Sequence, residues 1–123
     1  MSDRSALNEE YHNTKLTLLV NGIDVPLEKT KFTGHIITAW NPYSEKQSDE
    51  LNVKSNKLLM HDLSKFADSI FDAVGQNEEG TWIEKGFAIS GLEDATAIEI
   101  GRKFGQNAIF KVIDGRPQVV WCN

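Results

Sequence analysis

The pattern of apolar and polar positions in the first part of the chain indicates three strands. The strand candidates are residues 16–20, 23–27 and 32–40, which are apolar runs or alternate apolar with polar side chains. Between the first two, Asn21-Gly22 takes positive φ twice in a type I′ turn and predicts a hairpin. Pro26 places the second strand at a sheet edge or at its own end. Adjacent Ile36 and Ile37 indicate burial on both faces, in the middle of a sheet.

A helix with polar residues near its apolar side is predicted next. Pro42 ends the preceding strand, and Ser44 with Gln47 has the spacing of a capping box, while Ser48 is an alternative start followed by two acids. Asn52 lies on the border of the apolar stripe, so we expect this helix to carry hydrogen bonds as well as packing. The stripe consists of Leu51, Leu58, Leu59, Leu63 and Phe66.

The second half of the chain predicts two hairpins around a second helix. Strands are expected at residues 69–74 and 81–89, joined by the polar loop 75–80, and at residues 108–113 and 117–121, joined by an Asp-Gly turn. Ser90 with Glu93 has capping-box spacing, and Gly105 stands where a helix ends in the left-handed conformation. The apolar stripe of this second helix is Ala97, Ile100, Gly101 and Phe104.

The order β-β-β-α-β-β-α-β-β predicts an α+β fold. We expect a largely antiparallel sheet of about six to seven strands with both helices on one face, and the pattern does not give the strand order. The 123 residues are predicted to form a single domain, 1–123, with an N-terminal arm at 1–14, helical around Ala6–Tyr11, and a compact core at 15–122.

Composition and charge narrow the classes of function. The net charge is −5 and the sequence pI about 5.1, and the basic residues form no run, which argues against general nucleic-acid binding. An acidic surface fits solubility or a basic protein partner better than it fits DNA. The chain contains no apolar stretch of membrane-spanning length and no secretory signal, so we expect a cytoplasmic protein and no membrane partner. The single Cys122 fits a small buried hydrophobe near the end of the chain.

Familiar catalytic and cofactor motifs are absent from the sequence. Neither glycine-rich phosphate loop occurs, and the three histidines lack metal-ligand spacing. There is no nucleophile elbow, and Cys122 is a poor nucleophile. We therefore predict no metal and no cofactor.

A few polar residues remain open to two interpretations. Trp82 and Glu84 lie two apart in a strand and share a face, so the carboxylate either faces solvent or is covered, in which case its pKa rises. His61 complements a helix C-terminus or acts as a second acid-base group. Gln106 and Asn107 satisfy the open carbonyls of a helix end or present amides at the start of a strand.

Several short runs together resemble a known family. They are T-A-W-N-P at residues 38–42, Asn52, W-I-E at 82–84 and F-G-Q-N-A at 104–108. Over residues 32–121 the chain is similar to small bacterial proteins grouped as domain of unknown function family 3293, which implies a compact bacterial cytoplasmic domain and supplies no reaction. The polar members of the shared pattern are Thr38, Trp40, Asn41, Asn52, Glu84, Gln106 and Asn107.

Two classes of function fit these residues. Amides, an indole and a carboxylate suit recognition of a planar polar ligand, so the first is a non-catalytic binding module for a small polar or nucleotide-like ligand, or for a protein partner as in inhibitor or immunity proteins. The second is a small enzyme with Glu84, with or without His61, as general acid or base. A buried Glu84 with a raised pKa in a cleft favours the enzyme. The alternative use of the amides is to tie loops together.

Overall fold

The computed structural model describes residues 11–122. Its elements follow the predicted order, and the helical arm expected around Ala6–Tyr11 lies outside the described residues except for its last residue. The strands are β1 (Lys15–Val20), β2 (Ile23–Pro26), β3 (Gly34–Thr38), β4 (Ser69–Gln76), β5 (Ile83–Ser90), β6 (Ala108–Ile113) and β7 (Arg116–Trp121). The α-helices are α2 (Asp49–Leu63) and α3 (Asp94–Lys103), and short 3-10 helices occur at η1 (Leu27–Lys29) and η2 (Pro42–Ser44).

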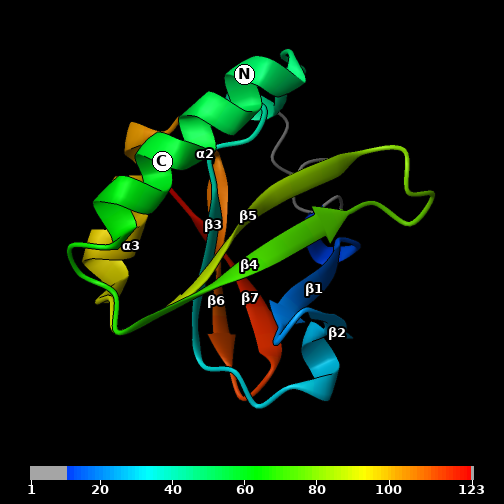
Figure 1. The fold of residues 1–123 in the computed structure, drawn as a ribbon, viewed down its shortest axis with the longest axis vertical. Coiled ribbons are helices and arrows are strands. Elements are labelled where there is room, and N and C mark those ends of the chain that lie inside the picture. The colour runs from blue at the N-terminus through cyan, green and yellow to red at the C-terminus, as the bar shows by residue number, and fades with distance from the viewer. Residues whose placement is uncertain (1–10, 123) are drawn as a thin grey trace.

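The seven strands form one antiparallel sheet in the order β2-β1-β4-β5-β3-β6-β7 (Figure 1). This confirms the α+β class and supplies the strand order that the sequence pattern left undetermined. β3 lies between β5 and β6, and Ile36 and Ile37 are 6% and 1% exposed, as expected for a central strand. β2, which ends at Pro26, is an edge strand.

Two hairpin turns and a helix end have the backbone conformations that their residues predict. Asn21 and Gly22 have φ of 50° and 78°, and the Asp-Gly turn before β7 likewise has two positive φ angles, as type I′ turns require. Gly105 has φ of 71° just after α3. A Cβ atom on Gly105 would also lie 2.8 Å from the Pro42 ring, so both the backbone and the packing require glycine there.

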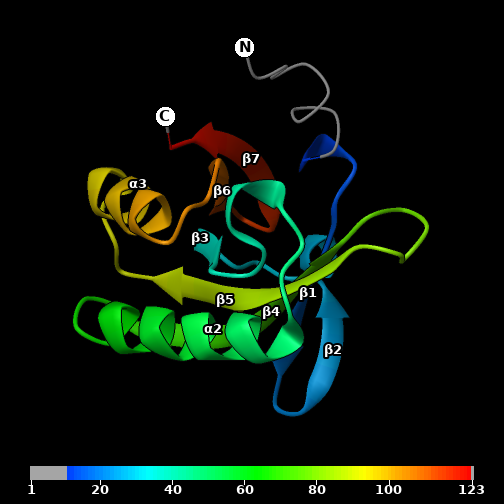
Figure 2. The same cartoon turned by 90° about the horizontal axis from the view of Figure 1, so that it is seen from above.

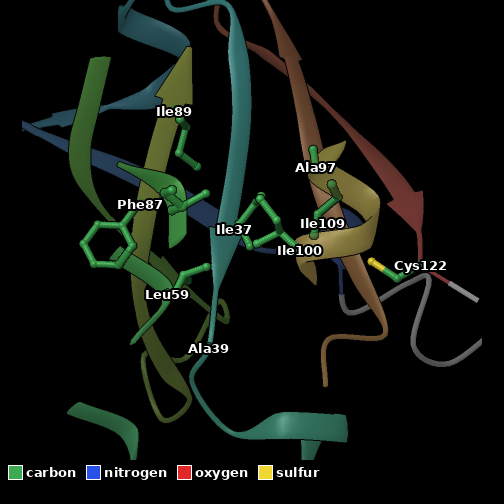
Figure 3. Packing of buried hydrophobic residues seen from close by; sticks show 10 residues of the cluster. Ile37, Ala39, Leu59, Phe87, Ile89, Ala97, Ile100, Ile109 and Cys122 are labelled. Atoms are coloured by element: carbon green, nitrogen blue, oxygen red, sulfur yellow. The ribbon is translucent and has the colours of Figure 1, made fainter. Parts of the chain in front are cut away.

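Both helices cover the same face of the sheet. Leu59 from α2 and Ile100 from α3 pack into one apolar cluster with strand residues such as Ile37 and Phe87 (Figure 3). Ala97 is fully buried in this cluster, and Cys122 is 1% exposed, which confirms the predicted stripe of α3 and the buried role of the cysteine. The two helices therefore bury the main apolar core against this face of the sheet.

The opposite face of the sheet is concave. Leu16 and Leu18 of β1 pack with Val112 of β6 and Leu27 of η1 in a second apolar cluster, although three strands separate β1 from β6 in the sheet. Such contacts require a strongly twisted and curled sheet, and Figure 2 shows the twist, because β2 runs across the direction of β5. The concave face is only partly filled, and its open end holds the candidate site.

The helix starts differ in part from those predicted. Ser48 caps α2, with its hydroxyl accepting from the Leu51 amide at 3.2 Å, so the Ser44 start is wrong because the chain is still turning in η2 there. The predicted Ser90 capping box is also wrong. Ser90 ends β5, Glu93 is the N-cap of α3 without a side-chain cap bond, and the Ser90 hydroxyl instead bonds to Ser69 at 2.6 Å.

The buried side of α2 is more polar than the predicted leucine stripe. Leu51, Leu58 and Phe66 are 52%, 57% and 56% exposed, so these three members of the stripe were assigned wrongly. The side chains of α2 that are buried are Asn52, Asn56, Leu59 and Leu63. The helix turns two amides toward the protein because they bind backbone groups at the end of β3, which apolar side chains would leave unpaired.

Candidate functional site

A pocket of about 600 Å³ opens on the concave face of the sheet. Its walls come from β1, β3, β4, β5 and β6, and its mouth from the β4–β5 loop, Ser44 and Tyr11. Gly75 and Gly86 line the pocket next to Glu84, because Gly75 is its register partner on β4 and Gly86 is the next residue on its own face of β5. Pockets of this size accept small organic ligands.

Glu84 is a mostly buried carboxylate in the wall of this pocket. Its Oε2 atom accepts a hydrogen bond from the Trp82 indole Nε1 at 2.9 Å, and the Asn41 side chain also hydrogen-bonds to the carboxylate. Burial outweighs these two hydrogen bonds and raises the pKa of Glu84 from 4.5 to about 7. Of the two interpretations of Glu84, the structure thus selects the covered carboxylate, on the same face as Trp82.

Tyr11 closes one side of the pocket and was not identified from the sequence. Its ring makes edge-on contacts with Phe110 and Trp121, with centroids 5.8 and 5.7 Å away. Its hydroxyl hydrogen-bonds to Ser44, and burial together with the negative charge of Glu84 raises the pKa of Tyr11 to about 12. An aromatic residue in a polar arm was the available signal, but it does not say which surface the ring covers.

Behind the pocket wall, Asn41, Asn52 and Gln47 form a closed amide network. Asn52 Oδ1 accepts from the Asn41 amide N–H at 2.8 Å and from Gln47 Nε2 at 2.7 Å. In return, Asn41 Oδ1 accepts from Asn52 Nδ2 and from the Gln47 amide, both at 3.0 Å. Asn41 and Asn52 are 6% and 1% exposed. Apart from the bond of Asn41 to Glu84, these groups therefore satisfy one another and the backbone, and neither Asn41 nor Asn52 lines the pocket.

The network exists because the chain makes an abrupt turn after β3. Asn41 has φ of 46° and ψ of 66°, a left-handed conformation that asparagine tolerates better than most residues. The turn removes the Ala39 and Asn41 amides from the sheet ladder. Asn56 Oδ1 accepts from the Ala39 N–H at 3.0 Å, and Asn56 Nδ2 donates to the Lys85 carbonyl at 2.9 Å. Asn56 follows Asn52 by one helical turn, so its spacing was a usable sequence signal that was missed.

The remaining predicted site residues lie around the pocket rather than all inside it. Thr38 lines it, and its hydroxyl donates to the Lys85 carbonyl and accepts from the Trp40 amide. Gln106 is 6% exposed and donates to the carbonyls of Trp40 and Phe104 at 3.4 and 3.3 Å, as predicted for a helix end. Asn107 Nδ2 donates to the Ser44 hydroxyl at 3.1 Å, at the pocket rim.

Trp40 and His61 lie away from Glu84. Trp40 is 7% exposed and contributes to a second hollow of about 570 Å³ on the helix side of the sheet, where Lys85 Nζ lies 5.9 Å from the centroid of its ring. His61 is exposed on α2 and lines neither hollow. The pairing of Glu84 with His61 is therefore not formed, because α2 packs on the sheet face opposite Glu84. In residues 11–122, no three His, Cys, Asp or Glu side chains are grouped to bind a metal.

A family model described as "Protein of unknown function (DUF3293)" matches residues 37–109. The chain belongs to this family. The match runs from β3 to the start of β6 and includes Glu84 and the amide network, whereas Tyr11 and the β1 wall lie outside it. Comparison with curated proteins and with solved structures gave no match. Neither α-helix in the described part of the chain is long and apolar enough to cross a membrane.

Proposed function

We propose that this DUF3293 protein binds a small polar organic ligand in the concave-face pocket, with Glu84 as the central recognition group. The observation that carries the proposal is a mostly buried carboxylate, held by Trp82 and Asn41, in the wall of a pocket of about 600 Å³. Leaving a carboxylate there costs free energy in the empty protein, and a ligand that pairs with it recovers part of that cost.

The structure favours a small ligand over a protein partner for this site. The carboxylate lies inside a pocket, whereas protein partners engage broad and flatter surfaces. The amide cluster does not offer a recognition surface either, because Asn41, Asn52 and Gln106 are buried and hydrogen-bonded. An inhibitor-like role would have to use another surface of the molecule.

A ligand screen with a positional readout tests the proposal. Pools of nucleosides, sugars, amino acids and amines are added to ¹⁵N-labelled protein, and amide and indole resonances are followed by NMR. A ligand should shift the amides of Gly75, Glu84 and Ala108 and the Trp82 indole. Amides beside the second hollow, such as that of Lys57, serve as the internal control. If every pool leaves the pocket resonances unchanged, the proposal fails.

A second function, general acid-base catalysis by Glu84, is favoured by one specific observation. The pKa of Glu84 is about 7, where a carboxyl group both accepts and releases a proton near neutral pH. Any ligand found in the screen should therefore be incubated with the wild type and with Glu84→Gln, and its mass and isomeric form followed by chromatography. Conversion by the wild type that is lost in the variant supports an enzyme, and an unchanged ligand supports a binding module.

A further inference from the structure

The charges around the pocket are of one sign. Among the described residues that line it, Glu78, Glu79 and Glu84 carry carboxylates, and no lysine, arginine or histidine is present. Glu78 and Glu79 are exposed at the mouth, whereas Glu84 lies deeper in the wall. A phosphate or carboxylate entering this space would meet negative charge without a cationic partner, which disfavours binding of an anion.

The basic side chains on the neighbouring strands point away from this pocket. Lys85 follows Glu84 directly and so projects to the opposite face of β5, where it lies over the Trp40 ring. Lys111 on β6 is paired with Asp94, with Nζ 2.7 Å from Oδ2. Neither lysine lines the pocket, so the carboxylate of Glu84 keeps no cationic neighbour there.

The same walls offer aromatic surface. Tyr11, Trp82 and Phe110 all line the pocket, and the Trp82 ring is fixed by its hydrogen bond to Glu84 while Tyr11 is held edge-on to Phe110. A carboxylate next to aromatic rings suits an organic cation, because the ammonium group pairs with the carboxylate and also interacts favourably with ring faces. The partly desolvated setting strengthens both interactions.

We infer that the ligand of this pocket is a small organic amine in its ammonium form, with an apolar or aromatic body, and that its charged group pairs with Glu84. This inference rests on the proposed function and narrows it to one ligand class. The same walls disfavour phosphate esters. They therefore also disfavour the nucleotide-like ligands that were among those expected from the sequence.

A matched series of three probes tests the charge directly. Phenethylamine, phenethyl alcohol and hydrocinnamate share a phenyl ring and a short chain but are cationic, neutral and anionic. Their dissociation constants are measured by NMR from the shifts of the Glu84 and Gly75 amides and the Trp82 indole. We expect the amine to bind at least about tenfold more tightly than the anion.

Glu84→Gln removes the negative charge of residue 84 and keeps the shape of the pocket nearly unchanged. The variant should weaken amine binding by about tenfold or more and change binding of the neutral alcohol by less than about threefold. Glu99→Gln, which removes an exposed carboxylate from α3, is the matched control and should leave all three affinities unchanged. Far-ultraviolet circular dichroism establishes that both variants are folded.

The pH dependence provides an independent readout. The titratable groups of the pocket are Tyr11, Glu78, Glu79 and Glu84, and of these Glu84 has a pKa of about 7. Because the ammonium ion binds the ionised carboxylate, amine affinity should rise between about pH 6 and about pH 8 in the wild type and stay flat in Glu84→Gln.

The possible outcomes separate this inference from the proposed function. Preferred binding of hydrocinnamate or the alcohol at the pocket resonances would overturn the amine assignment and leave a small-ligand site in place. Amine binding that is insensitive to Glu84→Gln would also overturn it. If none of the three probes shifts the pocket resonances, the inference fails, and the wider ligand screen alone decides whether the proposed function survives.

Discussion

Replacing Glu84 with glutamine should make the stability of the ligand-free protein less sensitive to rising pH. Glu84 has a pKa of about 7 in the folded protein, against an ordinary value of 4.5. Because the folded-state pKa is the higher one, the native protein holds an additional proton between these values, and its stability falls as pH rises through this range. The glutamine variant keeps an oxygen acceptor for the Trp82 indole but does not ionise.

The size of the effect follows from the pKa difference. Between 4.5 and about 7, at about 1.4 kcal/mol per pH unit, the ionised carboxylate lowers the free energy of unfolding by about 3 kcal/mol. The free energy of unfolding of Glu84→Gln, taken relative to that of the wild type, should therefore rise by about 3 kcal/mol between about pH 4.5 and about pH 8. Most of this gain should appear below about pH 7, where Glu84 of the unfolded chain is ionised and that of the native protein is not.

Urea unfolding followed by circular dichroism at several pH values measures this difference. Other carboxylates contribute equally to the wild type and the variant, so the difference between the two curves isolates Glu84. The exposed Glu99→Gln variant should run parallel to the wild type at every pH. A wild-type-to-variant difference that changes by less than about 1 kcal/mol across the range would show that Glu84 titrates near its ordinary pKa and would refute the reasoning.

Five further substitutions test the packing around the site by urea unfolding. Asn52→Ala should lower the free energy of unfolding by about 2–4 kcal/mol because it leaves buried amide partners without hydrogen bonds. Asn107→Ala at the partly exposed rim should lower it by less than about 1 kcal/mol, and equal losses would contradict the closed network. Leu59→Ala should lower it by about 2–5 kcal/mol and Leu58→Ala by less than about 1 kcal/mol, and the reverse order would show that α2 buries its other side. Gly101→Ala should be destabilising by about 1–3 kcal/mol, although alanine favours helices, because its Cβ would lie 2.7 Å from a β6 side chain; a stabilised variant would rule out this close approach.

Local chemistry allowed several parts of the fold to be predicted from the sequence. The Asn21-Gly22 turn, the end of α3 at Gly105 and the apolar stripe of α3 depend on residues close together in the chain, and the structure contains all three. The two helix starts were predicted less well. Ser44 and Ser90 have the spacing of capping boxes. In the structure, however, Ser44 lies in a left-handed turn and Ser90 pairs with β4, and the spacing alone predicts neither arrangement.

The predicted apolar stripe of α2 was wrong for a physical reason that the sequence pattern does not contain. A helix normally buries its leucines, yet Leu58 is 57% exposed and Asn56 is buried on the other side. The amides of Asn52 and Asn56 are turned inward by unpaired backbone groups at residues 39 and 41, and those groups come from the turn that ends β3. The hydrophobic pattern describes only the side chains of the helix itself. It contains no information about the hydrogen bonds that the backbone of a neighbouring segment needs.

By itself the sequence determined the class of fold, the order of its elements, the family and the placement of Glu84 two residues after Trp82. Only the tertiary structure decided that the sheet curls and brings Tyr11, Glu84 and Phe110 to one pocket, whereas Trp40 lines the second hollow on the other face. The physical reason is that alternation along a strand tells which residues share a face, whereas strand order and curvature decide which faces meet and whether the space between them is filled.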